Sequence, residues 1–259
     1  MDKNSPIGVF DSGIGGLTVL ESLKAIMPQE NFIYLADDAF YPYGIKTKSE
    51  IENRVLEVGK AFIKKDVKAI VIACNTASAN AQKLIKWAKI TIQTVIEPTA
   101  FAAFTYSNTK KIALLATKLT VSLGTYQNIL EEWKAKVYPL AASDLVDLAE
   151  SPNRNSSETK QKVMEIVNPL LNEDFDTLIL GCTHFGLLNE ALKAAFPKVK
   201  LIACGEPTAT KLKNDLIQLD LLTERKSNGS VELLCSRHPD FYQGKIDWLT
   251  FKHRNPRTW

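Results

Sequence analysis

One stretch, residues 68–79 (KAIVIACNTASA), constrains the fold more than any other part of the sequence. Residues 69–73 are a short apolar run, typical of a strand that is buried on both faces of a parallel sheet. Cys74 follows at the carboxyl end of this strand, and Asn75 and Thr76 are good N-caps for the alanine-rich segment after them. We therefore expect the Cys74 thiol to lie beside unpaired helical N–H groups, which favour the thiolate.

A similar arrangement occurs about a hundred residues later in the chain. Residues 176–180 (DTLIL) are a second apolar run, and Gly181-Cys182-Thr183-His184 leads from it into a helical stretch. Apolar strands and amphipathic helices alternate along most of the chain, which indicates parallel, doubly wound sheets. In such sheets ligands bind beyond the carboxyl ends of the strands, where both cysteines are expected.

The two halves of the chain resemble each other in this pattern. The first half has strand-Asp-Ser-Gly and strand-Cys-Asn-Thr, and the second has strand-Ala-Thr and strand-Gly-Cys-Thr. We expect an α/β fold of two similar doubly wound, mainly parallel-sheet domains, related by a pseudo-two-fold, with the active site in the cleft between them. The expected domains are residues 1–97 plus 208–259, with Asp11 and Cys74, and residues 98–207, with Glu150 and Cys182.

Three local expectations concern less regular parts of the chain. Residues 94–96 are expected to form a strand that Glu97-Pro98 ends. One helix, opened by Thr117 or Thr120, is expected to continue through Leu130. In the C-terminal tail, residues 231–234 and 246–249 are expected to form a hairpin, for which the sequence offers no function.

Composition excludes several classes of protein. Of the 259 residues, 45% are hydrophobic and 24% are charged, as in a soluble globular protein. The formal charge of +3 is small, and the Lys and Arg residues of the chain are dispersed among acidic residues. Neither nucleic acid nor a membrane surface is therefore implied as a partner. Without a leader-like N-terminus or an apolar run of about 18 residues, the default location is cytoplasmic.

Each candidate residue also has a structural explanation. A single cysteine after a buried strand is usually a core residue, and Cys204 and Cys235 are interpreted in this way. Cys182 and His184 with Cys235 and His238 have the residue types of a zinc site, but the first pair lacks the usual spacing, so no metal is expected. The glycine-rich turn at residues 13–16 matches neither the dinucleotide fingerprint nor a P-loop, and is interpreted as a tight turn whose N–H groups suit a small anion.

Five blocks of sequence resemble the signature blocks of bacterial glutamate racemases, in the aspartate/glutamate racemase family. They occur in the family's order: FDSGIGGLTVL (10–20), PYG (42–44), ACNTASA (73–79), IEP (96–98) and GCTHFGLL (181–188). The chain departs from the family pattern at Asp38, at Phe185-Gly186, in residues 141–150 and in residues 203–205. The resemblance implies cofactor-independent interconversion of L- and D-glutamate, which supplies D-glutamate for peptidoglycan, and a homodimer.

The resemblance also implies roles for particular residues. Cys74 and Cys182 would be the acid/base thiols, with Asp11 and His184 as their respective polar partners and Glu150 beside His184. The implied substrate-binding residues are Asp11, Ser12, Tyr43, Gly44, Asn75, Thr76, Thr120, Thr183 and His184. From the residues alone, Glu150 would be a solvated charge, His184 a helix-start residue and Tyr43 a residue that packs the loop.

The chemistry of racemisation agrees with two thiols. A proton must leave one face of the α-carbon and another must arrive on the opposite face, so two groups suffice, one as thiolate and one as thiol. No lysine lies in a setting suited to a pyridoxal phosphate Schiff base. Two alternatives remain: a racemase of aspartate or another acidic amino acid, and a two-lobed small-ligand binding protein, which would not need paired thiols.

Overall fold

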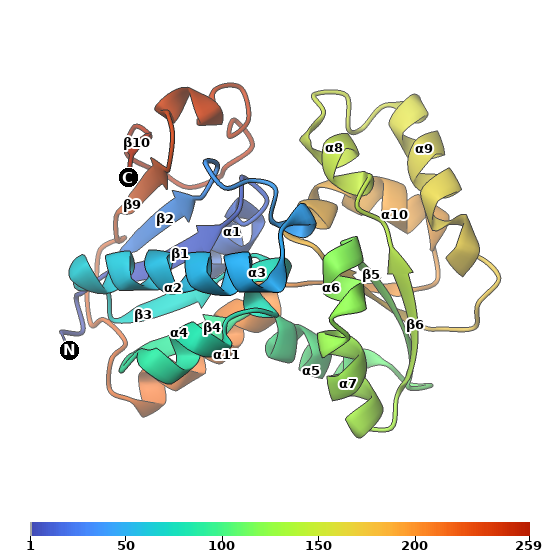
Figure 1. The fold of residues 1–259 in the computed structure, drawn as a ribbon, viewed down its shortest axis with the longest axis horizontal. Coiled ribbons are helices and arrows are strands. Elements are labelled where there is room, and N and C mark those ends of the chain that lie inside the picture. The colour runs from blue at the N-terminus through green and yellow to red at the C-terminus, as the bar shows by residue number, and fades with distance from the viewer. Residues whose placement is uncertain (1) are drawn as a thin grey trace. The chain divides into compact units, whose positions relative to one another are not determined.

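The structure is a computed structural model that describes residues 2–259. The chain forms two compact units: unit 1 runs to Val95 and resumes at Gly205–Trp259, and unit 2 is Ile96–Cys204. Each has its own sheet (Figure 1). The prediction of an α/β fold with parallel sheets is confirmed, since every strand pair described in residues 2–259 is parallel.

Unit 1 contains a six-stranded sheet in the order β10-β9-β2-β1-β3-β4. Its strands are β1 (Ile7–Asp11), β2 (Phe32–Ala36), β3 (Ala69–Ile72), β4 (Thr91–Thr94), β9 (Val231–Cys235) and β10 (Arg257–Thr258). Its helices are α1 (Leu17–Ile26), η1 (Tyr43–Ile45), α2 (Lys48–Lys64), α3 (Asn75–Ser78), α4 (Gln82–Trp87), α11 (Gly205–Gln218) and η4 (Pro239–Tyr242). Every residue of β1 and β3 is buried, as their continuous apolar runs require.

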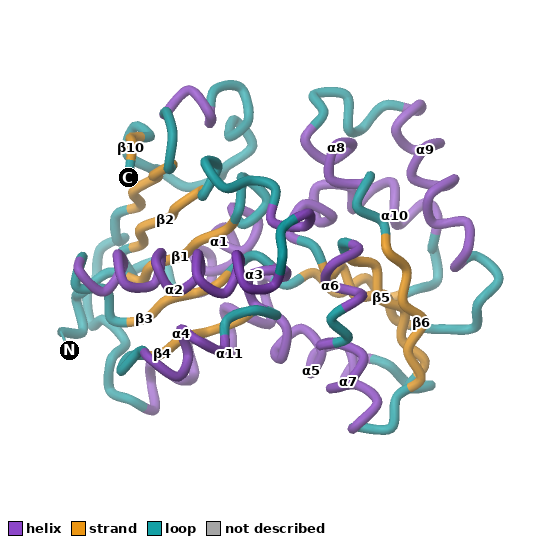
Figure 2. Tube along the Cα trace, in the orientation of Figure 1, coloured by secondary structure: helices purple, strands orange, loops and turns teal. Residues whose placement is uncertain are grey.

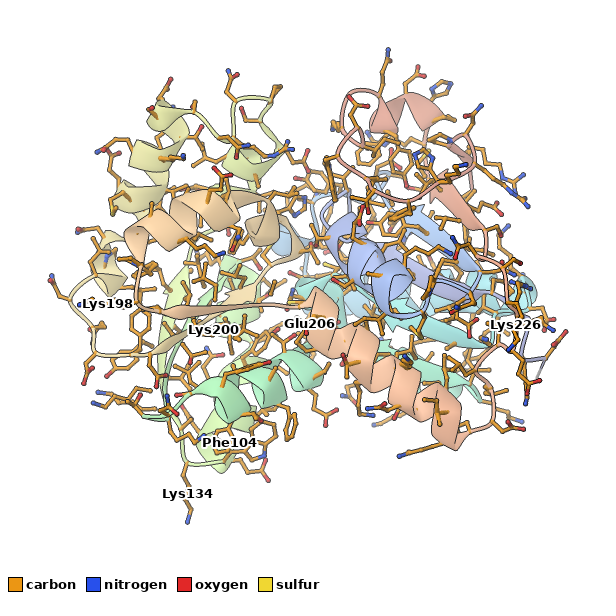
Figure 3. The ribbon with its side chains drawn as sticks, turned by 180° about the vertical axis from the view of Figure 1, so that it is seen from behind. Phe104, Lys134, Lys198, Lys200, Glu206 and Lys226 are labelled. Carbon is orange, nitrogen blue, oxygen red and sulfur yellow. The ribbon has the colours of Figure 1, made fainter. Side chains whose placement is uncertain are left out.

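Helices cover both faces of this sheet. α2 and α4 pack on one face, and α1 and α11 pack on the other, as Figures 1 and 3 show from opposite sides. α2 begins with a capping box in which Thr47 and Glu50 each accept a hydrogen bond from the other's backbone N–H. Its buried residues recur at helical spacing on one side, so the helix lies flat on the sheet.

Unit 2 contains a four-stranded sheet in the order β6-β5-β7-β8. Its strands are β5 (Lys111–Ala116), β6 (Lys136–Ala141), β7 (Thr177–Gly181) and β8 (Lys200–Ala203). Its helices are α5 (Ile96–Tyr106), α6 (Lys118–Ser122), α7 (Thr125–Glu132), α8 (Leu145–Glu150), α9 (Ser157–Val167), η2 (Asn168–Leu170), η3 (Thr183–Leu188) and α10 (Asn189–Ala195). Alternate residues of β5 and β7 pack with α9, α10 and η3 in one apolar core.

Three of the local predictions need correction. The strand predicted at 94–96 is β4, which ends at Thr94, and α5 begins at Ile96 with Pro98 in its first turn, where the missing N–H costs no helical bond. The single helix predicted after Thr117 is two helices, because Gly124 adopts a left-handed φ of 66° between them.

The hairpin predicted in the tail is wrong. β9 pairs in parallel with β2 on one side and, at Leu234 and Cys235, with β10 on the other, and residues 246–249 form no strand. Figure 2 shows that the segment between β9 and β10 is mostly loop. A two-residue parallel strand has too short a pattern to be found in a sequence. Within residues 2–259, no helix is both long and apolar enough to cross a bilayer.

The outer faces of both units carry charged side chains. Lys134, in the turn after α7, points away from unit 2 into solvent (Figure 3). Its φ is 64°, and it is one of four non-glycine residues with a left-handed backbone within the described part of the chain.

Candidate functional site

The Cys74 side chain is the N-cap of α3. Its Sγ accepts a hydrogen bond from the N–H of Ala77 at 3.5 Å, and its thiol donates to the Oγ of Ser12 at 3.9 Å. This corrects the prediction that Asn75 or Thr76 would cap the helix: both lie inside it and are 3% exposed. α3 is a single turn, so the direct N–H contact matters more to the sulfur than a helix dipole does.

Asp11 lies at the end of β1, the strand next to β3. It is 1% exposed, and its Oδ2 accepts a hydrogen bond from the N–H of Gly16 at 2.7 Å. The carboxylate therefore closes the glycine-rich turn and takes one of the N–H groups that the sequence suggested for an external anion. A Cβ on Gly16 would lie 2.5 Å from the Cβ of Asp11, so only glycine allows this approach.

Tyr43 and Gly44 lie in η1, which contacts α3. The Tyr43 side chain is buried, and its hydroxyl donates to Oδ2 of Asp37 at 2.7 Å. Burial, followed by the charge of Asp37, raises the pKa of Tyr43 well above its usual value, so the group remains a neutral donor. Arg54 of α2 forms a two-point contact with Asp37, Nε to Oδ2 at 2.7 Å and Nη2 to Oδ1 at 2.6 Å.

Sequence reasoning missed Asp37 and Arg54. The two residues are separated by 17 positions, and nothing in the sequence indicates that this arginine on a charged helix faces inward. The only available signal was Asp37 directly after the apolar strand β2, at a strand end where ligands bind.

In unit 2, Cys182, His184 and Glu150 form a chain of contacts. Cys182 follows β7 and is 8% exposed, and its Sγ lies 3.7 Å from Nδ1 of His184. Nε2 of His184 lies 3.0 Å from Oε1 of Glu150, the last residue of α8. With Glu150 accepting the Nε2 proton, neutral His184 presents an Nδ1 lone pair to the thiol.

Two threonines lie at strand ends in the same unit. Thr183 is 5% exposed and begins η3, directly after Cys182. Thr120, in α6 after β5, is fully buried and accepts a hydrogen bond from the hydroxyl of Thr117 at 2.9 Å. Because β5 and β7 are neighbours in the sheet, their carboxyl ends bring α6 and Cys182 to the same edge.

Tyr126 of unit 2 is also buried, and sequence reasoning did not single it out as functional. Its hydroxyl lies 3.8 Å from Sγ of Cys204, whose thiol donates to the carbonyl of Leu180 at 3.3 Å. Burial, followed by the neighbouring Cys204, raises the pKa of Tyr126 well above its usual value.

In unit 1, burial and the charge of Asp38 raise the pKa of Cys235 to about 11, so this thiol stays protonated at neutral pH.

The four cysteines, all in the described part of the chain, form no disulfide. Nor do residues 2–259 bring three or more His, Cys, Asp or Glu side chains together in an arrangement that would hold a metal ion.

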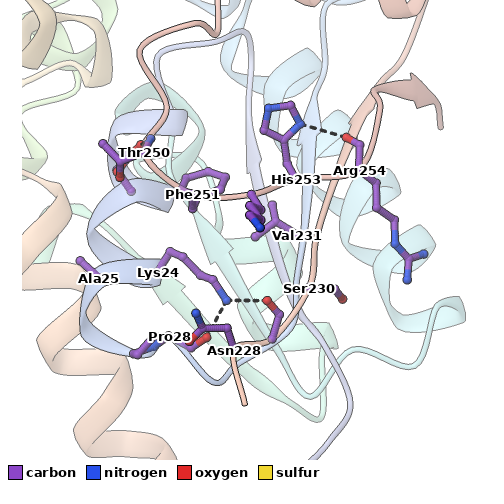
Figure 4. A pocket seen from close by; sticks show the side chains of 13 residues that line it. Lys24, Ala25, Pro28, Asn228, Ser230, Val231, Thr250, Phe251, His253 and Arg254 are labelled. Atoms are coloured by element: carbon purple, nitrogen blue, oxygen red, sulfur yellow. Dashed lines mark hydrogen bonds between the residues drawn. The ribbon is translucent and has the colours of Figure 1, made fainter.

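A cavity of about 750 Å³ lies elsewhere in unit 1, between α1 and the C-terminal tail. Figure 4 shows Lys24 of α1 and the segment with Phe251 and His253 on its wall. The Lys24 ammonium donates to the carbonyls of Pro28, Glu30 and Gly229, so all three of its protons are already used. None of the candidate residues described above lines this cavity.

Comparisons with known proteins agree with one another. Residues 12–212 match the model of the Asp/Glu/Hydantoin racemase family. A glutamate racemase of Clostridium perfringens (strain SM101 / Type A) is 35% identical over 238 residues, which cover 90% of this chain and 92% of that protein. The crystal structure of a glutamate racemase isoform from Bacillus anthracis aligns with a TM-score of 0.94 and 31% identity, covering 99% of this chain and 98% of the other. That of Francisella tularensis glutamate racemase in complex with D-glutamate aligns with a TM-score of 0.90 and 29% identity, with the same coverage.

Proposed function

The chain belongs to the Asp/Glu/Hydantoin racemase family and is an amino-acid racemase, and from this premise we propose that it interconverts L- and D-glutamate without a cofactor. Cys74 and Cys182 are the two acid/base groups of this proposal. The observation that supports this proposal most directly is the series of contacts from Cys182 to His184 and from His184 to Glu150, at 3.7 and 3.0 Å. A buried thiol beside an imidazole that a carboxylate supports is a proton-transfer unit.

On the Cys182 side, His184 takes the thiol proton at Nδ1 and leaves a thiolate that can remove the substrate's α-proton. Glu150 holds the imidazole in the required tautomer and stabilises the imidazolium that forms. When the substrate is the other enantiomer, Cys182 instead delivers a proton to the α-carbon, and His184 with Glu150 protonates the thiolate again.

On the Cys74 side, the N–H of Ala77 and the hydroxyl of Ser12 support the sulfur. The N–H donates to Sγ and stabilises negative charge there, while Ser12 accepts a hydrogen bond from Sγ when the group is a thiol. Asp11 supports this side through the glycine-rich turn that it closes.

The α-proton of an amino acid is a far weaker acid than a thiol, so the carbanion-like transition state must be stabilised. In our proposal the backbone N–H groups of Tyr43 and Gly44, and the side chains of Ser12, Asn75, Thr76, Thr120 and Thr183, bind the two carboxylates and the amino group. Buried donors of this kind are preorganised and act in a low-dielectric environment. Glutamate is preferred over aspartate because the relatives reported above are glutamate racemases.

The proposal includes a cellular role, which rests on resemblance to these relatives. The product D-glutamate would enter peptidoglycan synthesis, the enzyme would be cytoplasmic, and it would act as a homodimer. Sedimentation equilibrium of the purified protein tests the last point, and a mass of one chain at micromolar concentration would refute it.

Circular dichroism tests the activity directly. The purified protein, with no added cofactor, should bring either enantiomer of glutamate to a racemic mixture with zero ellipticity. L-aspartate under the same conditions should lose its ellipticity at least about 100-fold more slowly. Unchanged glutamate ellipticity at high enzyme concentration, or faster loss with aspartate, would overturn the proposed substrate.

A further inference from the structure

Two adjacent carboxylates, Asp37 and Asp38, begin the loop that leads to η1. Both are buried, with exposures of 0% and 6%. Asp37 faces α2 and binds Arg54 and Tyr43, as described above. Asp38 faces the opposite way, toward the C-terminal segment that follows β9.

Asp38 is bound entirely through one oxygen in the contacts that the structure describes. Its Oδ1 accepts hydrogen bonds from the N–H of Ser236 at 2.8 Å, the Oγ of Ser236 at 3.0 Å and the N–H of Arg237 at 3.1 Å. In return, the Oγ of Ser236 accepts a bond from the N–H of Ala39 at 2.7 Å. With a longer bond from Nη2 of Arg237 to the carbonyl of Ala39 at 3.4 Å, five hydrogen bonds join the loop and the tail. The three that end on a carboxylate are of the stronger kind.

The sheet explains why these segments meet. β2 and β9 are parallel neighbours, and Ala36 is paired with Cys235 in their register. The residues that follow the two strands therefore leave the sheet side by side. A further backbone bond, from the N–H of Ser236 to the carbonyl of Ala36 at 3.1 Å, extends the pairing beyond the strands.

The same loop connects to the Cys74 half of the candidate site. The N–H of Asp37 donates to the carbonyl of Asp11 at 2.9 Å, and η1 contacts α3, which Cys74 caps. A displacement of residues 38 and 39 would thus move Tyr43 and Gly44 relative to Asp11 and Cys74.

From this geometry we propose that Asp38, held by Ser236 and Arg237, is a positioning residue for the substrate. The tail fixes the loop of residues 37–45 in the one conformation in which Tyr43 and Gly44 bind the amino acid. This inference rests on the proposed function, which makes glutamate the substrate and Tyr43 and Gly44 two of the residues that bind it. It gives the C-terminal segment a role in substrate binding.

The test compares four variants with the parent protein. Asp38→Ala removes the acceptor of three hydrogen bonds and should raise KM for both enantiomers about tenfold, with kcat changed less than about threefold, because binding geometry is lost while both thiols remain. Asp38→Asn keeps an amide oxygen at the position of Oδ1 and should recover most of the loss. Ser236→Ala should raise KM about threefold. In the double variant Asp38→Ala/Ser236→Ala, KM should rise by less than the product of the two single effects, because the side chains share the bond from Oγ of Ser236 to Oδ1 of Asp38, while the bond from the Ala39 N–H is lost only with the serine.

A matched control separates positioning from stability. Glu232 lies on β9 and pairs with Arg257 of β10, away from the loop, so Glu232→Gln weakens the attachment of the tail without touching Asp38. It should leave KM unchanged even if the melting temperature falls. A purely structural role for Asp38 would instead lower the melting temperature of Asp38→Ala while KM stays at the parent value, and that result overturns the proposal.

Amide hydrogen exchange gives a readout that does not depend on activity. In Asp38→Ala the amides of residues 39–41 and 43–45 should exchange at least about tenfold faster, while those of β1 and β3 should not change. If the parent protein fails to racemise glutamate, the proposed function falls, and the exchange measurement alone decides the positional claim. Unchanged exchange in residues 39–45 would overturn it.

Discussion

At the level of single residues, the two cysteines differ in what surrounds the sulfur. Cys74 contacts a backbone N–H and a serine hydroxyl, neither of which can take up a proton at neutral pH. Cys182 contacts an imidazole that is backed by a carboxylate and can take up a proton. The sequence predicted both thiols at matched strand ends, but this difference depends on α8, which the chain reaches more than thirty residues before Cys182.

Replacing either cysteine with serine should abolish most of the activity. Serine has nearly the same shape but its hydroxyl is a much weaker acid, so Cys74→Ser and Cys182→Ser should each lower kcat/KM for glutamate by at least about 1,000-fold. Circular dichroism of the substrate measures the rate, and far-ultraviolet spectra should show an unchanged fold. Cys204→Ala is the matched control, since this thiol is equally buried and bonds to a backbone carbonyl. Full activity in both serine variants would refute the two-thiol mechanism.

Glu150→Gln should lower activity by about 10- to 100-fold, because the neutral amide stabilises the imidazolium of His184 less than a carboxylate does. The two enantiomers have equal free energies, so kcat/KM must fall by the same factor in both directions, whereas kcat and KM individually need not. Initial rates with L- and D-glutamate check this. Glu158→Gln, an exposed charge on α9, serves as control. A loss below about twofold would remove Glu150 from the mechanism.

At the level of elements, the turn after β1 shows what the sequence could predict. Its glycines indicated a tight turn, and the apolar runs before Asp11, Cys74 and Cys182 indicated parallel strands. Which group occupies the turn's N–H could not be read from the pattern, because it depends on the rotamer of Asp11. The same holds for the cap of α3, where sulfur replaces the expected Asn or Thr oxygen, and for the Asp38 contact with Ser236, which spans 198 positions.

Gly16→Ala should disrupt this turn. The added Cβ would lie 2.5 Å from the Cβ of Asp11 and 2.8 Å from the hydroxyl oxygen of Tyr34, which donates to the carbonyl of Gly13. We expect a loss of about 1 to 3 kcal/mol in the free energy of unfolding. We also expect a fall in kcat/KM that, expressed as an activation free energy, is larger than this loss, because Asp11 is displaced. Urea unfolding and racemisation rates measure the two effects. Gly244→Ala tests left-handed backbone strain without a close contact and should leave activity intact.

Asp176 connects the end of α5 to β7 in unit 2. It accepts hydrogen bonds from the Ser107 hydroxyl at 2.6 Å and from the N–H groups of Asn108 and Thr109 at 2.8 Å. Burial opposes ionisation, but these bonds outweigh it and lower the pKa of Asp176 to about 2. A lowered carboxyl pKa contributes stability above the ordinary value of 3.8, and this stability is lost as the pH falls through about 2.

Asp176→Asn should therefore destabilise unit 2 by about 1 to 2 kcal/mol at pH 7, after allowance for solvent screening. The difference from the parent protein should shrink as the pH falls below 4. Urea unfolding at pH 7, 5 and 3 measures it. Asp174→Asn is the control, because Asp174 is 81% exposed and pairs only with Lys111 in the described contacts. A difference that stays constant from pH 7 to pH 3 would contradict this account.

At the scale of the whole molecule, the chain builds two cores and passes between the units at residues 95/96 and 204/205. Unit 1 is assembled from two separate stretches of sequence, and a buried ion pair helps to join them. Lys68 and Glu30 are 0% and 2% exposed at their side chains and meet at 2.6 Å. Lys68 also donates to the carbonyls of Lys3 and Leu221, and Glu30 accepts from the N–H of Thr223, so the pair ties both stretches together.

Removing one partner leaves the other buried and uncompensated. Burial already lowers the pKa of Lys68 despite the opposing effect of Glu30, which shows that desolvation is the larger influence on this ammonium. Lys68→Met should thus destabilise unit 1 by about 3 to 5 kcal/mol, and Lys68→Met/Glu30→Gln should recover part of this loss because no charge then remains buried. Hydrogen exchange resolves the units: amides of β1 and β3 should exchange faster in Lys68→Met, while those of β5 and β7 keep the parent rates. Equal acceleration in all four strands would mean that the two cores unfold as one, and the separate contribution of the ion pair to unit 1 would be refuted.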